Sequence, residues 1–274
     1  MRSGRPSATA TIVACARALA GVDPVAVRLL PPAVSRMLSV VAGARSPWLF
    51  DLASLGLVGH LSRRTKAIDR VVARAMSSGI SQLVVLGAGL DARAWRMPEL
   101  ASAVVLEVDH PSTQAFKVRR ARRLALSARE VRFVAVDFER DSLSTRLTEA
   151  GLIAERPSMW IWEGVTPYLT ASAIEASLDV IAELSAAGSV LAMTYGTPDL
   201  ANVPAIVKPI VAPAFGLLGE PLRGLMTPDD AGGLVRARGF SVDEDGPCAD
   251  DAGLEDRDEA WFAIRERLVV ATRK

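Results

Sequence analysis

The chain has 274 residues, 50% of them hydrophobic, and a formal net charge of +1. This length suits one large domain, or a domain with an added subdomain, and the apolar content supplies a sizeable core. The near-neutral charge argues against a nucleic-acid-binding surface, and no apolar run is long enough to cross a membrane. The two cysteines, Cys15 and Cys248, form neither a disulfide framework nor a zinc motif, so we expect a cytoplasmic protein.

The N-terminal region, residues 7–78, is predicted to be helical. Ser7 and Thr9 are candidate N-caps for a first helix over about residues 9–20. Arg17 interrupts the apolar run of this segment, which favours an amphipathic helix over a secretory signal. A long amphipathic helix is predicted over about residues 60–77, where apolar residues recur on one helical face.

From residue 82 onward, short apolar runs alternate with helical stretches. These runs cover residues 82–87, 103–108, 131–136, 159–163 and 188–195. Continuous apolar strands separated by helices are typical of a parallel sheet that is buried on both faces, in a doubly wound α/β domain. The runs 239–245 and 265–274 are predicted to finish the sheet, with the last strand antiparallel. The expected fold is therefore an α/β, Rossmann-like, seven-stranded sheet.

An apolar segment over residues 203–226 interrupts this alternation. Its prolines prevent a long regular helix; they are Pro204, Pro209, Pro213 and Pro221. We predict that an insertion at about residues 200–228 forms a lid over the ligand cleft, and a plain packing subdomain is the alternative. The predicted organisation is an N-terminal helical cover, residues 1–78, followed by a core domain, residues 79–274, that carries the lid.

The most informative motif is the turn after the first predicted strand. Residues 87–92 read GAGLDA, and the second strand ends in an acidic residue, Asp109. Glycines let the backbone approach a ligand, and a carboxylate at the end of the second strand accepts ribose hydroxyls. This pairing predicts an adenosine-cofactor site that includes Gly87, Ala88, Gly89 and Asp109.

The same turn also fits a dinucleotide-binding pattern, so an NAD-dependent oxidoreductase remains an alternative. Asp91 lies within the turn, and a carboxylate beside a bound pyrophosphate would cost on the order of several kcal/mol. S-adenosylmethionine carries no phosphate and presents a sulfonium and an ammonium group. We therefore favour S-adenosylmethionine as the cofactor, and a methyltransferase as the class of enzyme.

Further acidic residues follow the third and fourth predicted strands. Asp137 is a candidate acceptor for the adenine amino group, with Phe138 beside it, and Glu163 is expected to face the cationic end of the cofactor. Ligands of open parallel sheets bind beyond the carboxyl ends of the strands, so these side chains are expected to converge on one crevice. His110, next to Asp109, is expected to shape the adenosine pocket. A helix cap or a solvated strand end is the alternative for each acid alone.

Basic side chains on the helix before the first strand complete the candidate site. Arg64, or its neighbour Arg63, would bind the cofactor carboxylate. His60 lies four residues before Arg64, on the same helical face, and is a candidate general base. The alternative for His60 is a buried histidine that is bonded to backbone. We interpret the basic run at residues 117–123 as a solvated helix face, because no aromatic residues are interleaved as in an RNA-binding surface.

Four motifs follow one another in the order QLVVLGAGLDARAWR, LEVDHP, VAVDFERDSL and WEGVTPYLT. Together they resemble the leucine carboxyl methyltransferase family, most closely its bacterial branch with polyketide carboxyl O-methyltransferases of the tetracenomycin type. The resemblance covers nearly the whole chain, and it favours Arg64 over Arg63. It implies that S-adenosylmethionine binds at Arg64, Gly87, Asp109, Asp137, Phe138 and Glu163. It also implies that Tyr168 lies near the acceptor.

The chain departs from the family members that methylate a protein C-terminus. Those members carry a lysine in the first helix, whereas no lysine precedes Lys66 here, and Asp-Phe-Glu at residues 137–139 replaces their Asp-Leu-Arg. The expected acceptor is therefore a small apolar, polyketide-like molecule, methylated on a carboxylate or a hydroxyl. A non-catalytic S-adenosylmethionine-binding protein is a further alternative. We expect no nucleic-acid or membrane partner, and the sequence leaves the oligomeric state open.

Overall fold

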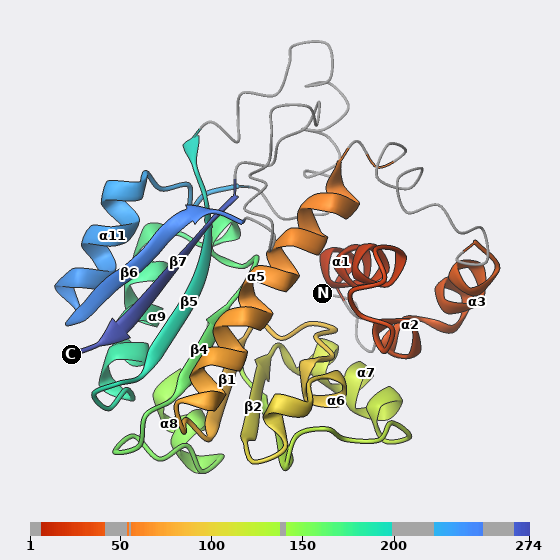
Figure 1. Cartoon of the computed structure of the whole chain (residues 1–274), viewed down its shortest axis with the longest axis horizontal. Helices are drawn as coiled ribbons and strands as arrows, with labels where there is room; N and C mark the ends of the chain where they lie inside the picture. The colour runs from red at the N-terminus through yellow and green to blue at the C-terminus, as the bar shows by residue number, and fades with distance from the viewer. Residues whose placement is uncertain (1–6, 42–53, 55, 138–140, 199–221, 249–265) are drawn as a thin grey trace.

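The computed structural model describes residues 7–41, 54, 56–137, 141–198, 222–248 and 266–274 (Figure 1). A seven-stranded sheet forms its centre, in the order β3-β2-β1-β4-β5-β7-β6. The strands are β1 (Gln82–Leu86), β2 (Val104–Asp109), β3 (Glu130–Ala135), β4 (Met159–Trp162), β5 (Val190–Gly196), β6 (Phe240–Pro247) and β7 (Glu266–Arg273). Strands β1 to β5 pair in parallel, whereas β7 is antiparallel to β5 and to β6. The predicted α/β fold with an antiparallel last strand is confirmed.

Helices cover both faces of this sheet, which explains why the central strands β1, β4 and β5 are almost entirely apolar and buried. One face packs against α1 (Ala8–Leu19), α2 (Ala26–Leu29), α3 (Pro32–Val41), α5 (Leu57–Ser77), α6 (Arg93–Arg96) and α7 (Pro111–Ala121). The other face packs against α8 (Leu143–Glu149), α9 (Ala171–Glu183) and α11 (Pro228–Ala237). In Figure 1, α5 (orange) crosses the near face of the sheet and α9 lies behind it. Two short 3₁₀ helices, η1 (Pro98–Leu100) and η2 (Thr166–Tyr168), complete the described elements.

The N-terminal helices follow the predictions closely. The Ser7 side chain accepts a hydrogen bond from the Ala10 N–H at 2.9 Å and caps α1, as expected. Helix α5 begins three residues before its predicted start at residue 60 and ends as predicted at Ser77. Gly79 follows with a φ of 96°, a left-handed conformation that suits glycine after a helix. These helices share one hydrophobic cluster with β1 and β2.

Two predictions about domain organisation, the lid and the helical cover, remain predictions. Residues 199–221, which hold most of the predicted lid, lie outside the described residues. The division at residue 78 between a helical cover and a core domain remains a prediction. Among the helices that the structure describes, none combines the length and the hydropathy needed to span a membrane.

Candidate functional site

The register of the sheet brings the predicted site residues to one edge. Leu86 of β1 lies beside Val108 of β2 and Trp162 of β4. The next residue of each strand is Gly87, Asp109 or Glu163. Parallel strands end at the same edge, so the glycine turn and both carboxylates emerge together there.

The glycine turn and Asp109 are in direct contact, as the sequence predicts. The Asp109 Oδ2 accepts a hydrogen bond from the Gly89 N–H, and the Ala88 N–H donates to the Val108 carbonyl at 2.9 Å. Gly87 and Gly89 adopt φ values of 68° and 49°, which side-chain-bearing residues rarely adopt. The backbone of the turn therefore packs against the end of β2, at the position predicted to bind the ribose.

Asp109 keeps capacity for a ligand beyond these contacts. Its Oδ1 accepts from the His110 N–H at 2.7 Å, so each carboxylate oxygen has one backbone donor and a remaining lone pair. Burial raises the pKa of Asp109 above its usual value, against the lowering effect of the Gly89 and His110 N–H groups. His110 is the N-cap of α7, because its Nδ1 accepts from the Ser112 N–H at 3.2 Å.

Asp137 lies two residues beyond β3, at the same end of the sheet. Its N–H donates to the Asp141 Oδ2 at 2.9 Å, and its carbonyl accepts from the Asp141 N–H at 2.8 Å. The Asp137 residue is half-buried. Phe138 lies outside the described residues, so its predicted role with adenine stays a prediction.

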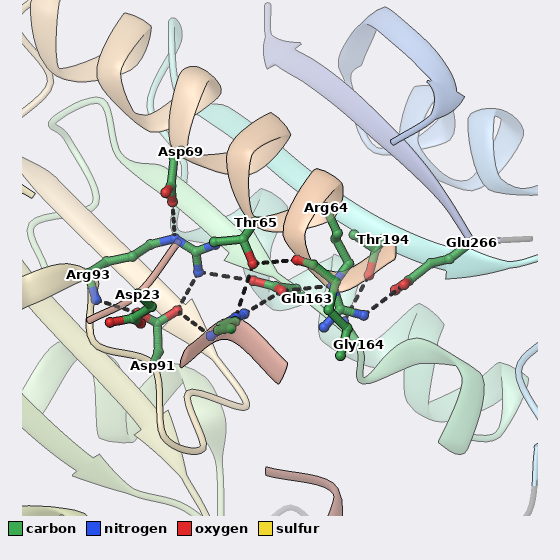
Figure 2. A network of polar contacts seen from close by, with 12 residues as sticks. Asp23, Arg64, Thr65, Asp69, Asp91, Arg93, Glu163, Gly164, Thr194 and Glu266 are labelled. Atoms are coloured by element: carbon green, nitrogen blue, oxygen red, sulfur yellow. Dashed lines mark hydrogen bonds and ion pairs between the residues drawn. The ribbon is translucent and has the colours of Figure 1, made fainter. Parts of the chain in front are cut away.

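Glu163 is the centre of a buried network of charges (Figure 2). Its side chain is 6% exposed and contacts Arg17, the Arg64 Nε at 2.8 Å and the Arg93 Nη1 at 2.9 Å. Burial by itself would raise the pKa of Glu163, but the charges of Arg17, Arg93 and Arg64 hold it well below its usual value. The Glu163 carboxylate is therefore charged at neutral pH, and it joins helices α1, α5 and α6 to the end of β4.

The network continues along α5 in both directions. Arg64 Nη1 and His60 Nε2 approach the same Glu266 Oε2, at 2.7 and 3.0 Å. This confirms that His60 and Arg64 share a helical face, and it shows that His60 Nε2 meets a carboxylate rather than backbone. Arg93 Nε lies 2.7 Å from Asp69 at the other end. Burial raises the pKa of Glu266, but Arg64 and His60 outweigh it and bring the value to about 2.

The described part of this network brings nearly equal numbers of opposite charges together. Its members are Arg17, Arg64, Arg93, Arg96 and His60 with Asp23, Asp69, Asp91, Glu163 and Glu266. Buried charges of this kind are stable only when opposite charges face them, so the network fixes the relative positions of α1, α5, α6 and the end of β4.

Asp91 has a different role from the one that the sequence argument gave it. Its carboxylate contacts the Arg93 guanidinium and lies 3.9 Å from Arg17, and its side chain is 5% exposed. Although burial raises the pKa of Asp91, the arginines lower it below its usual value. Because this charge is already compensated, the expected repulsion between Asp91 and a pyrophosphate is wrong as an argument against a dinucleotide.

The interpretation of the basic run as a solvated face is wrong for its first member. Lys117 is 1% exposed, and its Nζ lies 2.6 Å from Oε2 of Glu107, a residue that the sequence analysis left out. The sequence did indicate such a pair, because a glutamate inside the apolar run VVLEVD needs a buried partner. Arg119, Arg122 and Arg123 are exposed, as predicted. Arg17 and Arg93, also absent from the predicted site, are buried cations of the same kind.

Two neighbouring segments, which contain Val165 and Ala10, pack against the glycine turn. A Cβ on Gly87 would stand 2.4 Å from Val165 Cγ2, and a Cβ on Gly89 would stand 3.1 Å from Ala10 Cβ. Val165 directly precedes η2, which carries the half-buried Tyr168. Helix α1 and the η2 segment therefore flank the turn, and any larger residue in it would displace them.

The chain is similar in sequence to one family model and to several bacterial proteins. A family model described as leucine carboxyl methyltransferase matches residues 8–182. A Mycolicibacterium gilvum protein named "Putative S-adenosyl-L-methionine-dependent methyltransferase" is 37% identical over 229 residues, 79% of this chain and 72% of the relative. A Mycobacteroides abscessus protein of the same name is 40% identical over 161 residues, 58% of this chain. The chain spans about half of that relative, 54% of its length.

Solved structures of low sequence identity share the fold. A DUF574-family protein from Streptomyces avermitilis superposes with a TM-score of 0.65 at 17% identity, and the match covers 99% of each chain. A "putative methyltransferase" from Thermobifida fusca gives a TM-score of 0.62 at 18% identity, over 99% of this chain and 96% of that one. At these identities, the likeness concerns the fold alone.

Proposed function

Because the chain belongs to the leucine carboxyl methyltransferase family, we propose that it transfers a methyl group from S-adenosylmethionine to an oxygen of a small apolar, polyketide-like acceptor. The family and the names of the relatives support the cofactor and the reaction class. One observation carries the proposal: the Asp109 carboxylate bonds to the Gly89 N–H at the adjoining ends of β2 and β1. We place this reaction in natural-product biosynthesis in the cytoplasm.

The residues at the edge of the sheet fit S-adenosylmethionine chemically. Asp109 retains lone pairs for the ribose hydroxyls beside the Gly87–Gly89 turn. Glu163 is assigned to the ammonium and sulfonium groups, and Arg64 supplies a cation for the carboxylate. Asp137 and Phe138 are assigned to the adenine end, as the family resemblance implies.

S-adenosylmethionine, when bound, supplies an activated methyl group. The chain's residues would hold the acceptor oxygen in line with that group and exclude water. A carboxylate acceptor needs no base, whereas a hydroxyl would profit from one. His60 is the candidate, since Glu266 holds its ring at 3.0 Å and would stabilise an imidazolium. Tyr168 on η2 is the candidate to orient the acceptor.

The decisive test is binding of S-adenosylhomocysteine, measured by calorimetry. Replacing Asp109 with alanine should weaken binding by about 1–3 kcal/mol, the usual cost of losing a charged hydrogen-bond partner. Asp229→Ala is the matched control, because Asp229 is exposed at the start of α11. An equal dissociation constant for the wild type and Asp109→Ala would remove Asp109 from the site.

Turnover separates the remaining alternatives. Labelled S-adenosylmethionine with panels of carboxylic acids and phenols should give a methylated product, and a protein that binds without transfer to any panel member is a non-catalytic binder. A thermal shift with NAD but none with S-adenosylhomocysteine would support the oxidoreductase instead. Normal turnover of a hydroxyl acceptor by folded His60→Ala would exclude His60 as the base.

A further inference from the structure

The exposed arginines of α7 lie outside the charge network around Glu163. Arg119, Arg122 and Arg123 are exposed at the end of this helix, and Arg120 is partly exposed. The Arg120 Nε donates to the Arg28 carbonyl at 3.0 Å, which places the exposed Arg28 of α2 beside them. We call these arginines the α7 basic surface. Figure 1 shows α2 against α7, with α3 next to α2, at one side of the molecule.

The positive charge of this surface is not balanced by acidic residues nearby in the sequence. No aspartate or glutamate occurs in residues 24–41 or 110–129, the segments that contain α2, α3 and α7. Within the described residues, Arg28, Arg122 and Arg123 have no ion-pair partner. Like charges that lie close together repel, so this face of the molecule is suited to an anionic partner. The net charge of +1 conceals the face, because it averages over the whole chain.

Exposed apolar side chains accompany the arginines. Five large apolar residues are exposed in the described part of the chain, and three of them lie on α3 or shortly after α7: Met37 at 59%, Val40 at 81% and Leu126 at 43%. Arg36, Met37 and Val40 share the outward face of α3, because these positions fall within about 100° of arc, whereas Leu38 is buried. Basic and apolar side chains on one exposed helix face are typical of a helix that lies on a lipid bilayer.

A nucleic acid matches this surface less well than an anionic bilayer does. Phe116 is the only Phe, Tyr or Trp in residues 24–41 and 110–129, and it is half-buried, with the Arg120 guanidinium 5.9 Å from its ring centroid. The surface therefore offers no exposed aromatic side chain for stacking on bases, and a phosphate backbone gives Val40 no apolar contact. An anionic bilayer satisfies both features, because its headgroups pair with guanidinium groups and its acyl chains take up apolar side chains.

We propose that the α7 basic surface and the outward face of α3 bind the surface of an anionic lipid bilayer, without crossing it. This inference does not depend on the proposed methyl transfer. It revises the expectation that the chain has no membrane partner, which rested on the net charge. Helix α7 begins directly after Asp109 and His110, and its 11 residues span about 16 Å. Docking would therefore hold the predicted cofactor edge close to a phase in which apolar acceptors dissolve.

Co-sedimentation with lipid vesicles tests this proposal and needs neither cofactor nor acceptor. We expect the wild-type chain to bind vesicles of phosphatidylcholine with about one-third phosphatidylglycerol, and not vesicles of phosphatidylcholine alone. Binding should fall steeply between about 0.1 M and about 1 M salt, because salt screens the attraction between guanidinium groups and headgroup phosphates. The double variant Arg122→Gln/Arg123→Gln should lower the partition coefficient about 10- to 30-fold.

Matched variants separate the position of the charge from its amount. Arg156→Gln/Arg236→Gln removes the same charge from exposed arginines before β4 and on α11, and should leave vesicle binding unchanged. Val40→Ser should weaken binding several-fold, whereas Ile153→Ser, at an apolar residue of 40% exposure after α8, should not. Thermal unfolding of each variant checks that it is folded.

The proposal fails if Arg122→Gln/Arg123→Gln binds anionic vesicles as tightly as the wild type does, or if neutral and anionic vesicles bind equally. Low-salt binding to duplex DNA or to an acidic protein, without binding to vesicles, would also overturn it and assign the surface to that partner. A chain that binds anionic vesicles but neither S-adenosylhomocysteine nor S-adenosylmethionine would support this inference and reject the proposed function.

Discussion

Glu163 and Glu107 are two buried carboxylates at one sheet, and their surroundings shift their pKa values in opposite directions. Glu163 meets three guanidinium groups, which hold its pKa well below the usual value in spite of burial. Glu107 meets one ammonium, and burial raises its pKa to about 7. Desolvation acts on both, so the number of facing cations decides the sign of the shift. The Glu163 carboxylate therefore stays charged at neutral pH, whereas the Glu107 carboxylate titrates near neutral pH.

The largest expected effect on unfolding free energy comes from removing the charge of Glu163. Glu163→Gln leaves Arg17, Arg64 and Arg93 without their shared carboxylate, and we expect unfolding free energy to fall by about 3–5 kcal/mol. Urea unfolding at pH 7 measures this loss. Glu99→Gln, at an exposed glutamate, should stay within about 0.5 kcal/mol of the wild type. A loss below about 1 kcal/mol for Glu163→Gln would contradict a structural role for the network.

Acid should remove the stabilisation that the arginine network provides. The folded-state pKa of Glu266 is about 2, against 4.5 for the free side chain, and those of Asp91 and Glu163 are also lowered. The unfolded chain then binds more protons between these values, so stability is complete above about pH 5 and is lost as pH falls toward 2. Glu266 alone contributes on the order of 3 kcal/mol. Urea unfolding from pH 6 to pH 3 should show this decline, and a flat profile would contradict it.

Glu107 should give the opposite slope in a higher pH range. Its folded-state pKa of about 7 lies above the usual 4.5, so the folded chain binds the extra proton between these values. Its contribution to stability therefore falls as pH rises from about 4.5 to about 7, by on the order of 3 kcal/mol. The descending part of the curve should vanish in Glu107→Gln/Lys117→Met. If the double variant keeps it, another group is responsible.

The smallest expected effect on unfolding free energy comes from the N-cap of α1, the helix that carries Arg17. Ser7→Ala removes the N-cap of α1 and should cost about 1 kcal/mol in unfolding free energy. Ser39→Ala is the control, because the exposed Ser39 hydroxyl only bonds back to the carbonyl of Ser35 within α3. Equal effects of both substitutions would show that the Ser7 cap adds nothing to α1.

Elements with a local pattern could be predicted from the sequence. The apolar runs located β1 to β5 within two residues, because strands covered on both faces are rich in apolar residues. The glycine turn and Asp109 were identified for the same reason, since each follows directly from a strand end. Arg17 could not be assigned in this way: its partner Glu163 is 146 residues away, and only the packed α1 brings the two together.

Chain order and residue type thus determined the strand content, the family and the edge at which the glycine turn meets Asp109, since periodicity and turn chemistry act over a few residues. Tertiary packing decided which charges are compensated. It buried Lys117 against Glu107 and brought Arg17 of α1 within 3.9 Å of Asp91, so neither Lys117 nor Asp91 is presented to solvent or to a ligand as the sequence had suggested. The physical reason is that a charge removed from water takes its behaviour from the partners within a few ångströms, and only the folded chain chooses those partners.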